Sequence, residues 1–361
     1  MPPPLSPRDA GLVTHLQANG CHPFRLHAAM QYRPGCSECQ GVICQRGCKS
    51  DGWSRALAGA VGRPNLMLLQ DHVVRHVTET EGGITATITR ADGTETTLDA
   101  RLAVLTAGAL NTPQIIARSS PPGGGAHSPA LGCYLMFHVS DMFAVFPTST
   151  APAQFPLKSL SIRDFYQQDG QALGEIQSMG MQPATGMIAD FLKGEARGLG
   201  LGWAGPALEL LRIPAMFAER LFRPAALFAT ILEDLPYAAN RVWSAPGDDD
   251  IHISYGIADE LQRRAGLMRR AIGTAFRPCR VFFLTRLAQP NLGHPLGTCR
   301  MGEDRQTSVT SRDGQVHGWD RLFVADGSLF PSSGGSIPAS PSLPTRCGLH
   351  KRCNPGWRHE R

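Results

Sequence analysis

The chain has 361 residues, of which 42% are hydrophobic, and its formal net charge is +5. This length allows a large core and favours two structural domains over one. The small charge excess lies mostly in the last residues, so no nucleic-acid partner is expected. Residues 1–9 lack the basic and then apolar pattern of a secretory signal. This predicts a cytoplasmic, reducing location in which the ten cysteines are thiols or ligands.

Four of these cysteines form the pattern C-x2-C-x4-C-x3-C within thirteen residues: Cys36, Cys39, Cys44 and Cys48. Four thiolates at this spacing would suit zinc or an iron–sulfur cluster. The spacing differs from the C-x2-C-x2-C-x3-C run of ferredoxins, and a tight loop with small buried thiols is the alternative. We assign no metal ligand in this segment.

Residues 65–106 show the pattern of β-strands. Residues 65–77 are apolar and β-rich, residues 83–90 alternate, and Ala-Asp-Gly at 91–93 supplies a turn. A further strand is predicted at residues 96–106.

A helix is predicted directly after these strands. The run Gly-Ala-Leu-Asn-Thr-Pro at 108–113 ends in Thr112, which can cap a helix, and Pro113, which can begin one that continues through Ser119. A strand, a turn of small residues and a helix form either a cofactor-binding turn or an ordinary loop.

Residues 139–289 carry no recognisable chemical motif. Within them residues 203–232 are strongly apolar, but five charged residues and three prolines interrupt this run well short of the ~20 apolar residues of a membrane span. We predict buried or substrate-facing helices here. The alternative is that arginines set among leucine, phenylalanine and methionine lie on a lipid surface.

The C-terminal part contains the candidate catalytic residues. His294 lies in Gly-His-Pro-Leu-Gly-Thr-Cys-Arg-Met-Gly at 293–302, and an apolar strand predicted at 321–325 ends in Asp326 and Gly327. Ligands of open α/β sheets bind at the carboxyl ends of strands, so Asp326 and Gly327 are cofactor candidates, with an ordinary Asp-Gly turn as the alternative. A histidine, with a pKa of about 6.5, suits a general base, which contributes on the order of 10²–10⁴-fold in rate.

This C-terminal stretch resembles the signature of the glucose-methanol-choline (GMC) oxidoreductases, FAD enzymes that oxidise alcohols. Gly-Ala-Leu-Asn-Thr-Pro-Gln at 108–114 matches the second signature of that family. The resemblance implies an FAD-dependent, alcohol or choline dehydrogenase-like enzyme, in which His294 takes a proton while hydride passes to the flavin. It also implies that five residues line FAD: Val74, Gly108, Ala109, Asp326 and Gly327.

Three features depart from the family pattern. No Gly-x-Gly-x-x-Gly turn for the FAD pyrophosphate lies near the amino terminus, so weak FAD binding is expected. Ile337 stands where the family has a second catalytic His or Asn, and the neighbouring Ser336 would point elsewhere. The residues after 343 have no helical period.

The alternative function is a truncated, catalytically inactive fragment with a residual binding or structural role. His138 and His317, which lie in family blocks, are interpreted as structural.

The predicted fold class is α/β, with an incomplete Rossmann-like FAD-binding domain and an inserted α+β substrate domain on an antiparallel sheet. We predict a partial FAD-binding domain with the cysteine-rich segment at 1–138, a substrate domain at 139–290, a segment returning to the FAD domain at 291–343, and an irregular tail at 344–361. The expected partners are a small-molecule alcohol and an unknown electron acceptor.

Overall fold

The computed structural model divides into two compact units, which are described separately. The first unit consists of residues 1–60, 140–231 and 263–289, and the second of residues 61–139, 232–262 and 290–361. Within these units the structure describes residues 2, 4–26, 28–36, 43–148, 158–168, 170–245 and 249–335. Residues 1–60, assigned above to the FAD-binding part, group with the first unit; the functional domain boundaries stay a prediction.

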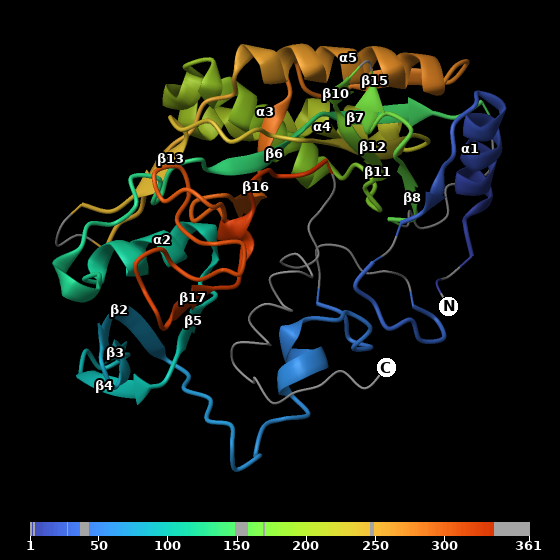
Figure 1. The fold of residues 1–361 in the computed structure, drawn as a ribbon. Helices are drawn as coiled ribbons and strands as arrows, with labels where there is room; N and C mark the ends of the chain where they lie inside the picture. The colour runs from blue at the N-terminus through green and yellow to red at the C-terminus, as the bar shows by residue number, and fades with distance from the viewer. Residues whose placement is uncertain are drawn as a thin grey trace. The chain divides into compact units, whose positions relative to one another are not determined.

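The first unit is built on the sheet labelled in Figure 1. The strands of this sheet that belong to the first unit are, in order, β1 (Phe24–Arg25), β8 (Leu160–Ile162), β11 (Gly174–Ser178), β12 (Ala226–Leu232), β7 (Met142–Phe146) and β15 (Arg280–Phe283). Antiparallel pairing joins β8 to β1 and β11, and β7 to β12 and β15. All seven residues of β12 are buried, as a central strand requires. The rings of Phe143, Phe228 and Phe276 pack with centroids 5.3 to 5.8 Å apart and form the centre of this core.

Helices accompany this sheet. α1 (Pro7–Ala18) is capped by the Ser6 hydroxyl. α5 (Asp259–Ala275) is tied to the strands by Arg269, whose guanidinium donates to the Asp141 carboxylate at 2.5 and 2.8 Å. The remaining short elements are η1 (Trp53–Leu57), β9 (Gln167–Gln168), β10 (Gln171–Ala172), α3 (Thr185–Gly198), the 3-10 segment η3 (Leu201–Leu211) and α4 (Arg212–Phe222).

The second unit combines a small antiparallel sheet with a parallel pair of strands. The antiparallel sheet contains β2 (His72–Thr80), β3 (Gly83–Arg90) and β4 (Glu95–Ala100). The parallel pair is β5 (Ala103–Leu105) with β17 (Leu322–Val324). The other elements are α2 (Gly108–Arg118), η2 (Pro122–Gly124), β6 (Met136–Ser140), β13 (Arg241–Trp243), β14 (His252–Ser254), β16 (Gln289–Leu296) and η4 (Gly327–Leu329). Its core includes Val77, Ile84, Leu105, Ile116, Trp319 and Leu322.

Several predicted elements of this unit are confirmed, namely β3, the turn at Gly93 with φ of 84°, and β17. The strand predicted from residue 65 begins only at His72. The single strand predicted at 96–106 is wrong, because the chain bends at Arg101 and forms β4 and β5 in different sheets.

The predicted start of helix α2 is also wrong. The helix begins at Gly108, and Pro113 lies inside it. Thr112 is not the cap, because its hydroxyl accepts from the Ala107 N–H at 3.1 Å and donates to the Asp326 carboxylate at 2.5 Å.

The prediction of buried or substrate-facing helices at residues 203–232 needs correction. The last seven of these residues belong to the buried strand β12, whereas Trp203, Phe217 and Leu221 are 67 to 83% exposed. Among the described residues, no helix combines the length and the apolar character needed to cross a bilayer.

Candidate active site

The parallel strands β5 and β17 end at the same edge of their two-stranded sheet, and two predicted cofactor residues lie there. The Ala325 N–H donates to the Leu105 carbonyl at 2.9 Å, which keeps the strands paired up to their ends. Helix α2 begins with Gly108 shortly after β5, and Asp326 follows β17. Because parallel strands present their carboxyl ends together, the topology brings Gly108 and Asp326 into contact.

Asp326 joins its own segment to the start of α2 at this edge. One carboxylate oxygen accepts from the Gly108 N–H at 2.9 Å and from the Thr112 hydroxyl at 2.5 Å, and the other accepts from the Ser328 N–H at 2.8 Å. A negative charge at the amino end of α2 also interacts favourably with the helix dipole. The side chain is only 9% exposed, so its bonds to buried donors hold the edge together.

The segment that carries His294 is anchored to the same edge. The Gly297 N–H donates to the Gly327 carbonyl at 3.2 Å, and the Thr298 hydroxyl donates to the Ala109 carbonyl at 2.6 Å. A Cβ atom added at Gly327 would lie 3.0 Å from a methyl group of Leu296 and 3.3 Å from the Pro295 carbonyl oxygen, so the two segments approach each other closely here. The structure therefore brings four of the predicted cofactor residues together at this edge: Gly108, Ala109, Asp326 and Gly327.

His294 contacts a second histidine, His138, for which a structural role was predicted from the sequence. The Nδ1 atoms of His138, on β6, and His294, on β16, lie 3.2 Å apart, and the ring planes are inclined by 76°. The other ring nitrogen of His138 lies 3.1 Å from the Ser333 carbonyl oxygen. His138 is fully buried, whereas His294 is partly exposed.

If both rings are neutral, these two contacts favour one tautomer of each ring. A carbonyl oxygen only accepts hydrogen bonds, so Nε2 of His138 carries a proton and Nδ1 of its neutral ring is an acceptor. The proton between the two rings must then belong to Nδ1 of His294. Neutral His294 consequently has its lone pair on Nε2, the atom directed away from His138, which is the protonation state that a general base requires.

The partner of His138 is itself held by a buried carboxylate residue. The Asp234 N–H donates to the Ser333 hydroxyl at 2.7 Å. The Asp234 carboxylate accepts from the Phe137 N–H at 3.1 Å and from the Tyr255 hydroxyl at 2.9 Å. Burial raises the pKa of Tyr255, so its hydroxyl stays a donor. Asp234 thus fixes the residue before His138 and the residue that His138 bonds to.

Val74 lies at a different hollow of the second unit. This hollow has a volume of about 340 Å³ and is lined by His72, Val73, Val74, Ala107, Asn111, Gln114, Ile115, Arg118, Asp249 and Ile251. It therefore extends from Val74 to the start of helix α2, beside Gly108. Gly108 has a φ of +82°, and a Cβ atom there would meet no atom within 4 Å, so the backbone is open to a ligand.

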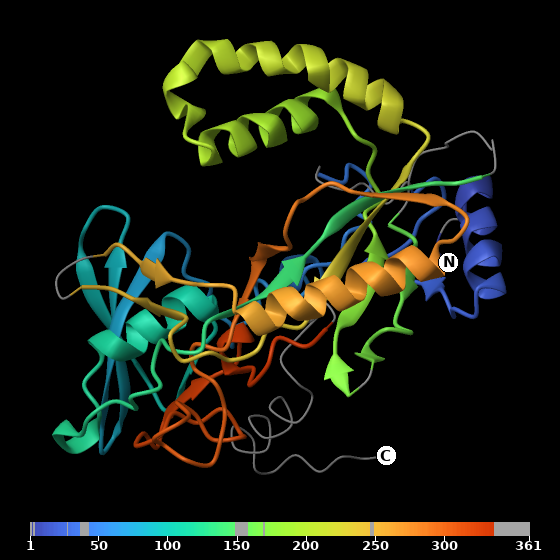
Figure 2. The ribbon, with the colours of Figure 1, turned by 90° about the horizontal axis from the view of Figure 1, so that it is seen from above.

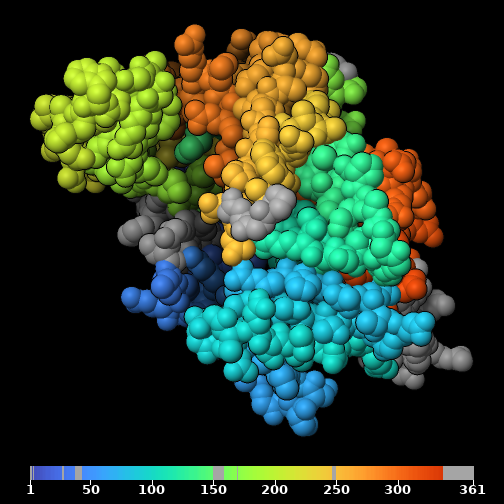
Figure 3. All heavy atoms as spheres, turned by 90° about the vertical axis from the view of Figure 1, so that its left-hand side faces the viewer, coloured from blue at the N-terminus to red at the C-terminus, as the bar shows by residue number. Residues whose placement is uncertain are grey.

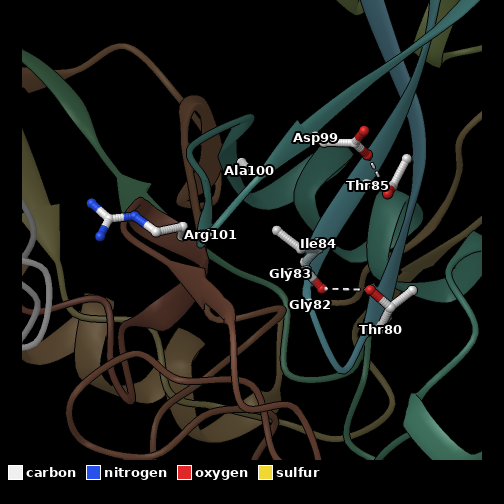
Figure 4. A pocket seen from close by; sticks show the side chains of 8 residues that line it. All are labelled: Thr80, Gly82, Gly83, Ile84, Thr85, Asp99, Ala100 and Arg101. Carbon is white, nitrogen blue, oxygen red and sulfur yellow. Dashed lines mark hydrogen bonds between the residues drawn. The ribbon is translucent and has the colours of Figure 1, made fainter.

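A second, larger hollow lies at the end of the β2–β3–β4 sheet (Figure 4). Its volume is about 540 Å³, and the lining residues include Thr80, Gly83, Asp99 and Arg101. The Thr85 hydroxyl donates to the Asp99 carboxylate at 2.6 Å. None of the candidate catalytic or cofactor residues lines this hollow.

The structure describes Cys36, Cys44 and Cys48 of the cysteine segment, whereas Cys39 lies outside the described residues. The Cys48 N–H donates to the Cys44 sulfur at 3.4 Å, and backbone N–H groups, first that of Cys48, lower the pKa of Cys44 to about 7. Within the part of the chain that is described, no three His, Cys, Asp or Glu residues are placed to hold a metal ion. The four-cysteine ligand hypothesis is untested, and Ser336, Ile337 and the tail also lie outside the described residues.

Comparison with known proteins identifies the class to which this fold and site belong. The two family models of the GMC oxidoreductases match residues 20–140 and 270–344, which together make up more than half of the chain. The chain therefore belongs to the GMC oxidoreductase family, and the predicted resemblance is confirmed.

Individual relatives share 26 to 28% of the aligned residues with this chain. An uncharacterized GMC-type oxidoreductase of Mycobacterium tuberculosis is 26% identical over 338 residues, which is 88% of this chain and 50% of the relative. The 2-methyl-1,2-propanediol dehydrogenase of Mycolicibacterium austroafricanum is 28% identical over 282 residues, 70% of this chain and 48% of the relative. The chain spans about half the length of these curated relatives.

Solved structures confirm the predicted fold class. A pyridoxine 4-oxidase structure from Mesorbium loti superposes with a TM-score of 0.57 and 18% identity, and covers 98% of this chain and 71% of the other. An FAD-dependent oxidoreductase from Chaetomium thermophilum gives 0.59 and 16%, with 97% and 72% covered. At these identities the likeness shows the fold alone.

Proposed function

We propose that this chain carries the proton-accepting site of a flavin-dependent enzyme that oxidises an alcohol CH–OH group, with His294 as the base. The observation that carries this proposal is the bonded series from the Ser333 carbonyl through His138 to His294, because it leaves the lone pair on Nε2 of His294. Relatives named as a dehydrogenase of 2-methyl-1,2-propanediol and an oxidase of 6'''-hydroxyparomomycin C support an alcohol substrate.

The residues of the second unit fit FAD as the cofactor. Val74 and Ala107 line the hollow of about 340 Å³, and the open backbone at Gly108 allows close approach of a ligand. The hydrogen bonds of Ala109, Asp326 and Gly327 described above hold the turn at Gly108 in place. When bound, FAD supplies the acceptor for the hydride removed from the carbinol carbon.

The protein's own contribution is to remove the hydroxyl proton. Nε2 of His294 accepts the proton from the alcohol oxygen, and the ring becomes an imidazolium. Its Nδ1–H continues to donate to His138, whose acceptor nitrogen stabilises the positive charge. The Ser333 carbonyl keeps His138 in the accepting tautomer throughout, so neither ring has to turn. As the proton leaves, the carbon–oxygen bond gains double-bond character and the product is a carbonyl compound.

The test begins with cofactor binding by the complete chain. We would titrate it with FAD, follow flavin fluorescence, and then assay primary alcohols and diols with an artificial electron acceptor. His294→Ala should lower kcat on the order of 10²–10⁴-fold while FAD affinity stays within about twofold, because the residue acts in proton transfer. The control is His22→Ala, since the His22 side chain is 88% exposed.

Two outcomes would overturn the proposal. Equal turnover by the parent and His294→Ala would remove His294 from the mechanism. Absence of both FAD binding and turnover would favour the alternative, an inactive fragment with a residual binding or structural role.

A further inference from the structure

Residues 185–223 of the first unit form a helical hairpin, in which α3 and α4 lie side by side and η3 connects them (Figure 2). The Thr185 N–H donates to the Glu219 carboxylate at 2.8 Å, so the start of α3 lies against the end of α4. The Lys193 ammonium donates to Glu209 at 2.7 Å and ties α3 to η3. The hairpin is therefore an internally bonded element.

The inner face of the hairpin is apolar and faces the sheet. Between them lies a cavity of about 450 Å³. The hairpin contributes Met187, Ile188, Phe191, Leu192, Pro214, Ala218 and Phe222 to its wall, and the strands contribute Met142, Leu227, Phe282 and Leu284. This face alone explains why α3 and α4 carry one apolar stripe.

A second apolar surface lies on the outer face. On α4 it consists of four side chains that are 55 to 70% exposed: Ile213, Met216, Phe217 and Leu221. Their spacing of i, i+3, i+4 and i+8 places them in one stripe. Leu199 and Trp203, at the end of the hairpin, are 79% and 83% exposed. In Figure 3 the hairpin, coloured yellow-green, forms one continuous surface that reaches solvent.

Exposed apolar side chains are concentrated in this element. Ten of the large hydrophobic residues that are exposed among the described residues lie between 185 and 223, and two of them, Met187 and Phe191, also line the inner cavity. A helix that is apolar on two faces is typical of a buried core or of a lipid environment. An extended exposed apolar surface marks an interaction site.

The exposed charges of α4 beside the outer stripe are cationic. Arg212, Arg220 and Arg223 of the α4 segment are exposed. The acidic residue of the same helix, Glu219, is partly buried and engaged by Thr185, whose hydrogen bonds lower the pKa of Glu219. The outer face of α4 therefore combines an apolar stripe with positive charge.

We propose that the outer face of this hairpin binds the surface of a bilayer with anionic headgroups, an interaction independent of the proposed oxidation. Arg220 lies within the apolar stripe, three and four residues after Phe217 and Met216. A second protein copy would have to bury this guanidinium, whereas at a bilayer its stem packs on apolar surface and its charge reaches the headgroups. Trp203 would lie at the level of the headgroups too, since tryptophan favours the membrane interface.

The experiment measures binding of the complete chain to vesicles of phosphatidylcholine, with or without phosphatidylglycerol, by co-sedimentation. We expect binding to the anionic vesicles, weakened by salt, and a blue shift of tryptophan fluorescence. Phe217→Ser combined with Leu221→Ser should lower the partition coefficient at least about tenfold, because two apolar side chains no longer enter the interface. Met67→Ser is the matched control, because Met67 is 75% exposed and lies outside the hairpin.

Two further measurements test the position of Trp203 and the folding of the double variant. Trp203→Phe should abolish most of the blue shift while leaving co-sedimentation within about threefold, since phenylalanine is also apolar. Thermal unfolding by circular dichroism shows whether the double variant is folded. Failure of the parent to bind anionic vesicles, or equal binding by the folded double variant, would overturn the proposal. A concentration-dependent dimer that the double variant abolishes, without vesicle binding by the parent, would assign the face to a second copy instead.

Discussion

The edge of β5 and β17 in the second unit and the helical hairpin in the first unit use their side chains in opposite ways. At the edge, Asp326 is 9% exposed and accepts hydrogen bonds from three residues of two distant segments. In the hairpin, Phe217 is 70% exposed and follows an apolar pattern that local packing does not require. Substitution should therefore cost folding stability at the first site and association at the second.

The largest effect is expected at the edge. Asp326→Asn places an amide where the Gly108 N–H and the Thr112 hydroxyl donate to a carboxylate, so at least one buried donor loses its acceptor. Hydrogen bonds to charged groups contribute about 1.5–3 kcal/mol each, and we expect a loss on the order of 3 kcal/mol in the free energy of unfolding. Urea titration measures it. The matched control is Asp99→Asn, because Asp99 accepts from Thr85 in the same way but is exposed. Equal losses in the two variants would show that burial is not the cause.

The next effect concerns the histidine pair. His138→Phe removes the acceptor for Nδ1–H of His294, so the base loses its fixed tautomer. We expect kcat to fall on the order of 10²-fold with little change in KM. His138→Gln can donate to the Ser333 carbonyl and accept from His294, and should recover part of the loss. If glutamine is no better than phenylalanine, His138 contributes packing and not proton positioning.

A smaller effect is expected from acid. Burial lowers the pKa of His317 below its ordinary value of 6.5, and its ring bonds to the Ser308 hydroxyl at 2.9 Å. Below pH 6.5 the unfolded chain takes up a proton at this residue before the folded chain does, so the free energy of unfolding falls as pH decreases. His317→Gln should flatten this part of the stability profile. An unchanged slope would assign the acid sensitivity to other groups.

The smallest effect on folding is expected in the hairpin. Phe217→Ser should change the free energy of unfolding by less than about 0.5 kcal/mol, because the side chain faces solvent. Phe143→Ala, in the fully buried ring cluster, should cost about 3–5 kcal/mol in the same urea titration. A large loss for Phe217→Ser would mean that the outer stripe packs within the protein.

The sequence predicts the edge better than it predicts the hairpin. The apolar run before Asp326 and the small-residue turn at Gly108 are local signals, whereas the parallel pairing of β5 with β17 is known only from the structure. The start of α2 was misplaced because the Thr112 hydroxyl bonds to Asp326, a residue 214 positions away. His138 lies 156 residues from His294, and its place in a family block was the one signal for a role in the site. For the hairpin, apolar composition predicts burial, because composition does not distinguish a core-facing from an outward-facing stripe.

The pairing of β5 with β17 also constrains how the protein is made. Gly108 and Asp326 are 218 residues apart, so the ribosome must add that length before the carboxylate can reach its donors. At about 5–20 residues per second, β5 waits on the order of ten seconds or more for its partner strand. During that interval one edge of β5 and the amino end of α2 have no native partner from the C-terminal segment. Slow elongation or early release would leave these groups available for non-native contacts.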